Sequence, residues 1–159
     1  MDINSEGPEE ATDYEIGVAI RMLSSRGTAP TRATPFSAGF DLYSAENMTL
    51  VKGESGMVWT HIALAIPCGL CALILPRSGL SRNFPNYIRN APGLVDSDYR
   101  GEIGISVINN SNDDWRISQG DRIAQMLFVA HAANFIKFIE VNELPGSLRG
   151  AGGFGSTGL

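Results

Sequence analysis

Short apolar runs, each ended by turn-forming residues, constrain the fold of this chain more than any other feature. The runs are rich in β-branched side chains, and Gly, Pro, Asn and Ser separate them at close spacing. This pattern is typical of an all-β sandwich or barrel. We expect strands over residues 18–22, 40–44, 48–51, 57–60, 64–66, 71–75, 102–109, 115–117 and 125–130.

Helical spacing of apolar residues occurs in only one short stretch. It runs from Ser78 to Asn83 and follows directly on Pro76-Arg77. This length allows a helix of one or two turns. The sequence therefore predicts an all-β sandwich or barrel with one short helix and no internal repeat.

Composition indicates one globular domain with two atypical ends. The chain has 159 residues, of which 43% are hydrophobic and 18% charged, enough for a single core. We expect residues 1–15 to be a disordered acidic arm, residues 16–145 the β domain, and residues 146–159 a flexible Gly-rich lid. The net charge of −5 argues against a nucleic-acid partner but allows a small anion held by local arginines.

The sequence also lacks the features of a membrane or exported protein. No apolar run approaches the roughly 20 residues that cross a bilayer, and the first residues lack the basic and apolar regions of a signal peptide. We expect a soluble intracellular protein of the cytoplasm or nucleus, of cellular or viral origin, with no membrane partner.

Two cysteines lie close together in Cys68-Gly69-Leu70-Cys71. A zinc site needs about four ligands, but there is no second Cys pair, and His61 and His131 stand apart. A redox pair should open a helix after a strand, whereas Pro67 precedes this pair and an apolar run follows it. We interpret both cysteines as small buried thiols.

Residues 90–108 combine turn residues and carboxylates between two apolar runs, and we expect a β-hairpin with a functional tip. Alternation from Ile103 to Val107 predicts a strand with one buried face. Pro92 and Gly93 should open a gap in the ladder that exposes backbone groups to a ligand. Asp96, Asp98 and Tyr99 surround this gap, although in isolation such residues are ordinary turn formers.

Two further segments carry groups suited to phosphate. Arg77 offers a planar fork, Ser78 a hydroxyl, and Gly79 an unobstructed N–H at a helix start; alone, this pattern equally fits a structural turn. The tail combines a cation, an aromatic ring and hydroxyls among glycines, where the alternative is a disordered terminus. Its candidate residues are Arg149, Phe154, Gly155, Ser156 and Thr157.

Taken together, the segments resemble the five motifs of the trimeric deoxyuridine triphosphatase (dUTPase) family. They occur in the family's order, and the resemblance extends from about Ile16 to the terminus. The segments are Ala38-Gly39-Phe40-Asp41-Leu42-Tyr43-Ser44-Ala45, Pro76-Arg77-Ser78-Gly79-Leu80-Ser81, residues 90–108, Gly120-Asp121-Arg122-Ile123-Ala124-Gln125, and residues 149–158.

The resemblance implies a jelly-roll homotrimer whose sites are shared between subunits. It would hydrolyse dUTP to dUMP and pyrophosphate, which limits uracil in DNA and supplies dUMP for dTMP synthesis. Mg²⁺ would be held by substrate phosphates and waters, with no direct protein ligand. Asp41 would hold a water of the metal's shell or brace the site.

The resemblance also implies residue roles. Asp96 would be the general base, and Arg77 and Ser78 would bind the α- and β-phosphates. Gln125 would contact phosphate or water. Asp98 is more consistent with a structural role, and Asp121-Arg122 is interpreted as a structural ion pair.

The remaining roles concern the nucleoside and the tail. The Asn90 amide and backbone groups of Ala91 and Gly93 would read uracil. Tyr99 would lie on the deoxyribose and exclude a 2′-hydroxyl. Phe154 would stack on the base while the other tail residues hold the γ-phosphate.

Two alternatives remain at this stage. One is an enzyme related to dCTP deaminase on a similar fold, which would require different base-reading groups. The other is an interaction protein that uses the nucleotide as a switch.

Overall fold

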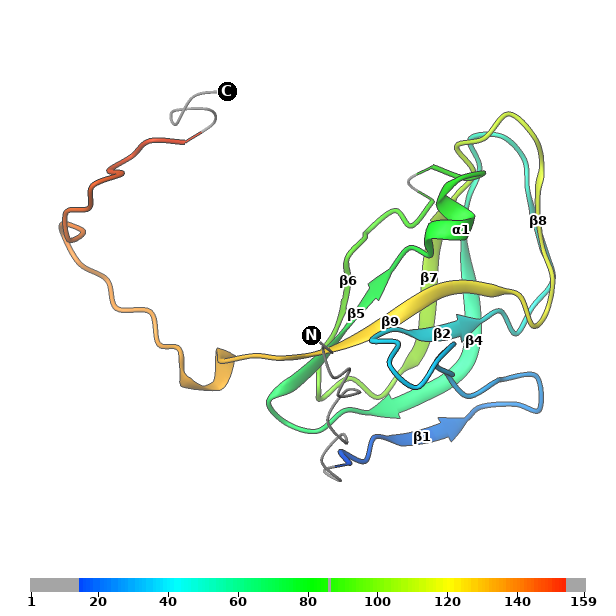
Figure 1. Cartoon of the computed structure of the whole chain (residues 1–159), viewed down its shortest axis with the longest axis horizontal. Coiled ribbons are helices and arrows are strands. Elements are labelled where there is room, and N and C mark those ends of the chain that lie inside the picture. The colour runs from blue at the N-terminus through cyan, green and yellow to red at the C-terminus, as the bar shows by residue number, and fades with distance from the viewer. Residues whose placement is uncertain (1–14, 86, 154–159) are drawn as a thin grey trace, which may run out of the picture.

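The chain folds almost entirely into antiparallel strands (Figure 1). The computed structural model describes residues 15–85 and 87–153. Within them lie β1 (Ala19–Met22), β2 (Phe40–Tyr43), β3 (Met48–Leu50), β4 (Ser55–Ala65), β5 (Leu70–Leu75), α1 (Ser78–Ser81), β6 (Gly93–Val95), β7 (Glu102–Ile108), β8 (Trp115–Ile117), β9 (Arg122–Ala130) and the 3-10 turn η1 (Ala133–Phe135).

The strands form three sheets around one core. Their orders are β1-β4-β7, β2-β9-β5-β6 and β3-β8, and every pairing between them is antiparallel. This is a jelly-roll type of β fold, so the predicted fold class is confirmed. The short helix expected after Pro76-Arg77 is confirmed as α1.

The core depends on alternation along the strands. On β7, Ile103, Ile105 and Val107 are buried, whereas Gly104 and Ser106 lie on the other face. Each such side chain contributes about 1.5–3 kcal/mol when buried. A slip of one residue would expose all three, so this register is strongly favoured.

The first correction concerns β4. We expected two strands, over residues 57–60 and 64–66, but one strand runs from Ser55 to Ala65. The register with β7 shifts between Trp59 and Ala63, and His61 has a left-handed backbone with φ 53°. A bulge therefore absorbs the irregular residues within a continuous strand, where the sequence pattern appeared broken.

The second correction concerns residues 90–108, which do not form a hairpin. β6 pairs with β5, through Gly93 and Ile74 among others, whereas β7 pairs with β4. The opposite edge of β7 meets the segment around Ile88, which bridges to Val107. Gly93 is thus part of a ladder, and the expected gap is limited to residues 90–92. Alternation predicts which face of a strand is buried, but it does not identify the partner strand.

The cysteines have different environments. Cys71 is buried in β5, as expected, but Cys68 is exposed. Cys68 lies in the turn between β4 and β5, where Gly69 has φ 86°, and its sulfur accepts a hydrogen bond from the Asn134 amide (3.1 Å). Both thiols are free.

After β9 the chain leaves the body of the fold as an extended arm, residues 131–153 (Figure 1). Large apolar side chains along it are exposed, and Phe138 is 95% accessible. The expected acidic arm lies outside the described residues except for Glu15, as do the last six residues of the expected lid. No helix among the described residues is long and apolar enough to cross a membrane.

Candidate functional site

The start of α1 is anchored to β9 by a buried tyrosine. The Arg77 backbone N–H donates to Tyr87 Oη (2.8 Å), and Tyr87 Oη donates to the carbonyl of Ile123 (2.8 Å). Ser81 Oγ donates to the Arg77 carbonyl (3.1 Å) and closes the helical turn. Because Tyr87 is fully buried, the backbone of Arg77 has a fixed position beside β9.

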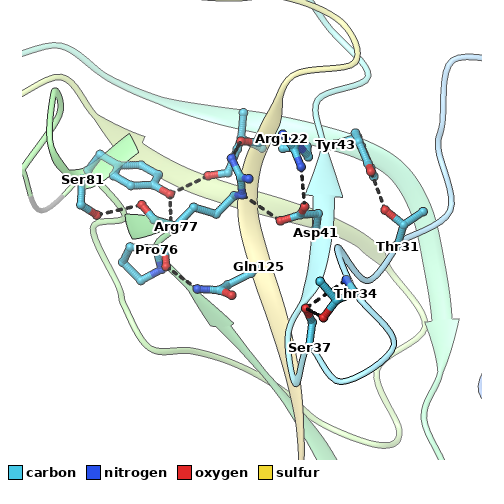
Figure 2. A network of polar contacts seen from close by, with 12 residues as sticks. Thr31, Thr34, Ser37, Asp41, Tyr43, Pro76, Arg77, Ser81, Arg122 and Gln125 are labelled. Carbon is cyan, nitrogen blue, oxygen red and sulfur yellow. Dashed lines mark hydrogen bonds and ion pairs between the residues drawn. The ribbon is translucent and has the colours of Figure 1, made fainter. Parts of the chain in front are cut away.

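The Asp41 carboxylate orients two arginines (Figure 2). Arg77 Nε donates to Oδ1 (2.8 Å) and Arg122 Nη1 to Oδ2 (3.2 Å). Asp41 is only 8% exposed, and a buried carboxylate is tolerated because both oxygens are paired. Arg77 Nη1 also donates to the Arg122 carbonyl (3.1 Å). A guanidinium has further N–H groups, so Arg77 retains donors for an anion.

The expected Asp121-Arg122 ion pair is wrong. Arg122 pairs with Asp41, and Asp121 Oδ2 instead accepts the backbone N–H of Ser118 (2.8 Å). Asp121 lies in the turn before β9, where its side chain closes back onto Ser118, whereas Arg122 opens the strand and reaches β2. Neighbours in sequence are therefore poor candidates for a pair here.

Gln125 faces the same region from β9. Its Nε2 donates to the Pro76 carbonyl (2.9 Å), and it pairs in register with Asp41 on β2. A Cβ on Gly39 would lie 2.5 Å from Gln125 Oε1, so a larger residue there would displace the end of the Gln125 side chain.

A cavity of about 390 Å³ lies where these groups meet. It brings together five of the predicted site residues, drawn from β2, β9 and the start of α1. Its lining consists of Ala33, Ser37, Ala38, Gly39, Asp41, Arg77, Ser78, Gly79 and Gln125. Ser37 was not among the candidates; it lies just before the first motif, in a loop where it pairs with Thr34 Oγ1 (2.8 Å).

Asp96 and Tyr99 line a different cavity, of about 180 Å³. The Tyr99 N–H donates to the Asp96 carbonyl (3.2 Å), and Tyr99 Oη donates to the carbonyl of Glu102 (3.0 Å). No described residue donates a hydrogen bond to the Asp96 carboxylate, so the carboxylate is available to water. The two cavities share no lining residue.

Asn90 and Ala91, two of the residues expected to read a base, lie in the turn that precedes β6, and Gly93 is the first residue of that strand. Asn90 and Ala91 are exposed, the Ala91 N–H donates to the Ile88 carbonyl (3.4 Å), and the Ala91–Pro92 peptide is cis. Gly93 is buried, and a Cβ there would lie 3.2 Å from the Asn90 amide nitrogen. The Asn90 amide is thus packed against the backbone that enters β6.

Of the candidate tail residues, only Arg149 lies within the described residues, and it lines neither cavity. Arg149 is exposed in the arm, and its Nε donates to the Gly152 carbonyl (2.9 Å). Phe154, Gly155, Ser156 and Thr157 lie outside the described residues.

Among the described residues, no group of three His, Cys, Asp or Glu side chains is placed so that it could hold a metal ion. Both oxygens of Asp41 are occupied by guanidinium groups. This donor set fits Mg²⁺ bound mainly through substrate phosphates and waters.

Fold and site together define a class of protein, a jelly-roll β domain with an arginine-containing polar cavity at the start of its short helix. The family model described as dUTPase matches residues 25–158. The chain therefore belongs to the dUTPase family.

Known relatives match this chain along most of its length. A deoxyuridine 5′-triphosphate nucleotidohydrolase from Anaplasma marginale is 46% identical over 142 residues, 87% of this chain and 95% of that protein. A dUTPase mutant of Staphylococcus bacteriophage 80alpha, solved with dUpNHpp, is 27% identical, with TM-score 0.82 over 90% of this chain and 99% of that one. A dUTPase mutant from phage phi11 of S. aureus, described with a structural Mg(II) ion, is 25% identical, with TM-score 0.73 over 80% and 98% of the two chains.

The Tyr87 anchor leads to a stability prediction. Tyr87→Phe should lower the free energy of unfolding by about 1–3 kcal/mol, because the Arg77 N–H and the Ile123 carbonyl lose their partner. Urea unfolding measures the change. Tyr43→Phe is the control, since it removes an exposed hydroxyl that pairs with Thr31 (2.6 Å), and its effect should be smaller.

The same residue predicts an alkaline pH dependence. Burial raises the pKa of Tyr87 above its ordinary value, against the opposing effect of Arg77. The unfolded chain then releases this proton more readily than the folded one, so stability is lost as pH rises above about 10. Tyr87→Phe should reduce this slope; an unchanged slope would assign it to other groups.

Proposed function

We propose that this protein hydrolyses dUTP to dUMP and pyrophosphate. The observation that carries the proposal is the cavity in which Arg77, Ser78 and Gln125 meet beside Asp41, in a chain of the dUTPase family. The reaction limits uracil incorporation into DNA and supplies dUMP for dTMP synthesis.

In this proposal the cavity at α1 binds the α- and β-phosphates. Arg77 contributes the N–H donors not used by Asp41 and Arg122, and Ser78 contributes its exposed hydroxyl. Gly79 leaves the backbone accessible, because nothing lies within 4 Å of the position that its Cβ would occupy. Gln125 contacts phosphate or water through the oxygen that faces Gly39. The guanidinium stabilises charge that builds on the leaving pyrophosphate.

Asp96 acts as the general base. Its carboxylate orients a water opposite the leaving group and accepts a proton from it as the oxygen attacks the α-phosphorus. A bond forms between the water oxygen and phosphorus, and the bond to the bridging oxygen breaks as pyrophosphate leaves. The exposure of Asp96, and the lack of a hydrogen bond to its carboxylate from any described residue, support this role.

Selectivity belongs to the segment that contains Asn90 and Tyr99. The Asn90 amide supplies a donor and an acceptor for uracil, together with backbone groups of Ala91 and Gly93. The Tyr99 ring lies against the deoxyribose and leaves no room for a 2′-hydroxyl. At 45% exposure the ring is accessible to a ligand.

Mg²⁺ would accompany the nucleotide, held by phosphate oxygens and waters. It supplies charge neutralisation and orientation of the phosphate chain. Asp41 lines the same cavity and would contact its water shell at most, since both of its oxygens already accept hydrogen bonds.

A homotrimer with shared sites accounts for the separation of the two cavities. The base and the phosphate-binding groups line different cavities of one chain, so a second copy is needed to combine them. Leu94 and Tyr99 line the second cavity beside Gly104, and the half-exposed Trp59 and Met57 lie against Gly104. This apolar face and the exposed arm suit contacts with other copies of the chain.

In the trimer, the tail acts as a lid over a neighbour's site. Residues 146–159 would close over the nucleotide, with Phe154 on the base and Arg149, Gly155, Ser156 and Thr157 around the γ-phosphate. Closure would exclude water other than the nucleophile. The outward course of the arm from its own body supports this placement (Figure 1).

Pyrophosphate release from dUTP, UTP, dTTP and dCTP tests the proposed activity. We expect rapid hydrolysis of dUTP and little of the other three. Ammonia release from dCTP would instead favour deaminase chemistry. A protein that hydrolyses none of the four would contradict the proposal.

The assignment of the base predicts that Asp96→Asn lowers turnover of dUTP by about 10²-fold or more while the nucleotide still binds. The amide fills the same space but cannot accept the proton. Single-turnover kinetics and equilibrium binding of dUTP separate the two effects. Asp98→Asn, two residues away, is the matched control and should remain active. Normal turnover in Asp96→Asn would remove Asp96 from the mechanism.

Shared sites predict that two inactive variants complement each other. Asp96→Ala is co-refolded with a chain truncated before Arg149, and mixed trimers are confirmed by mass. With random assembly, about a quarter of the sites combine an intact base with an intact tail, so activity should return. Mixed trimers that stay inactive would show that each tail serves the same subunit as its base.

A further inference from the structure

Glu102 connects the Tyr99 cavity to the bulge in β4. Its carbonyl accepts the hydrogen bond from Tyr99 Oη (3.0 Å), and the residue lines the same cavity as Asp96 and Tyr99. Its carboxylate is used elsewhere, because Oε1 accepts the backbone N–H of His61 (2.8 Å). One residue thus contacts both the ring and the bulge.

The bulge leaves the His61 N–H without a ladder partner. Trp59 pairs with Gly104 and Ala63 with Glu102, so the residues between Trp59 and Ala63 lie opposite Ile103 alone. Thr60 Oγ1 donates to the Ile103 carbonyl (2.7 Å), and the Glu102 carboxylate accepts from His61. Side chains therefore replace the missing backbone bonds of this ladder.

The bulge is held firmly from its other side. His61 is the only non-glycine residue with positive φ among the described residues. Its Nδ1 hydrogen-bonds to Ser24 Oγ (2.6 Å), Nε2 lies 3.5 Å from Glu46 Oε1 and 4.0 Å from Glu102 Oε1, and its carbonyl accepts the Leu23 N–H (2.8 Å). The His61 N–H therefore has a well-defined position.

The Tyr99 ring depends closely on the backbone beside it. A Cβ on Gly101 would lie 2.6 Å from Tyr99 Cζ, so the ring rests directly on the Gly101 main chain. A shift of residues 101–102 would move the ring with them.

We propose that Glu102 is a positioning residue for sugar discrimination. Its carboxylate ties the start of β7 to the His61 N–H, and its carbonyl then holds the Tyr99 hydroxyl, which fixes the ring's distance from the sugar. The inference rests on the proposed function and extends it, because it attributes part of the choice between dUTP and UTP to a contact on β4.

The test measures kcat/KM for dUTP, UTP and dTTP in the full-length protein. In Glu102→Ala the preference for dUTP over UTP should fall about tenfold, the scale on which one hydrogen bond acts, while the preference over dTTP is retained. Glu102→Gln should restore the sugar preference, because its amide oxygen can still accept the His61 N–H. If Glu102 only stabilised the fold, kcat/KM for all three nucleotides would fall together in Glu102→Ala.

Two further variants make the comparison specific. Glu54→Ala is the matched control, since it also removes a carboxylate that accepts a backbone N–H, that of Val51 (2.9 Å), but away from the Tyr99 cavity. His61→Gly keeps the N–H and suits the positive φ, so it should keep the sugar preference. A loss in His61→Gly equal to that in Glu102→Ala would overturn the role assigned to the N–H.

An unchanged preference in folded Glu102→Ala would overturn the proposal. If that variant does not fold, Tyr99→Phe decides, because it removes only the hydroxyl that reaches the Glu102 carbonyl. Tyr99→Phe should also lower the preference for dUTP over UTP. An unchanged preference in this variant would contradict the role of Glu102. The parent protein is measured first. If it does not hydrolyse dUTP, the proposed function and this inference are overturned together. If the parent prefers dUTP over UTP and Tyr99→Phe has the same preference, only the role of Glu102 is overturned.

Discussion

The paired carboxylate of Asp41 is the interaction on which the geometry of the cavity at the start of α1 depends. It joins β2 to Arg77 at the start of α1 and to Arg122 at the start of β9. Removing one partner of such a group leaves a buried charge uncompensated, which is costly. The same contact orients the Arg77 guanidinium at the cavity, so the stability of the fold and the orientation of this guanidinium have one physical origin.

The two cavities lie in different parts of the jelly-roll. Asp41, Gln125 and the residues at the start of α1 line one of them, and Asp96 and Tyr99 line the other, where β6 leads into β7. In the proposed trimer, assembly of whole subunits would combine these two sets of residues without refolding either. The bulge at His61 and the carboxylate of Glu102 belong to this second set, although neither residue type indicates such a role in sequence.

Several features were predictable because they depend on local pattern. Alternation along residues 103–107 identified a buried face, and Arg77 with Ser78 and Gly79 identified the helix start that lines the cavity. Other features were not predictable. Asp121 beside Arg122 suggested a pair, but the Asp121 carboxylate accepts the Ser118 N–H in the turn before β9, and Arg122 pairs with Asp41 on β2. Glu102 was not among the candidates because its carboxylate accepts a backbone N–H that only the bulge leaves unpaired, and its carbonyl accepts from the Tyr99 hydroxyl.

The sequence by itself determined the fold class, the order of the motif segments and the residue types available for phosphate, base and sugar. These follow from periodicity, turn chemistry and side-chain chemistry, all of which act over a few residues. Only the tertiary structure decided that β6 pairs with β5 rather than β7, that Asp41 pairs with two arginines, and that the Tyr99 hydroxyl donates to the Glu102 carbonyl. Strand pairing and ion pairing depend on burial and on competition among partners that are distant in sequence. A pattern that extends over a few residues does not contain this information.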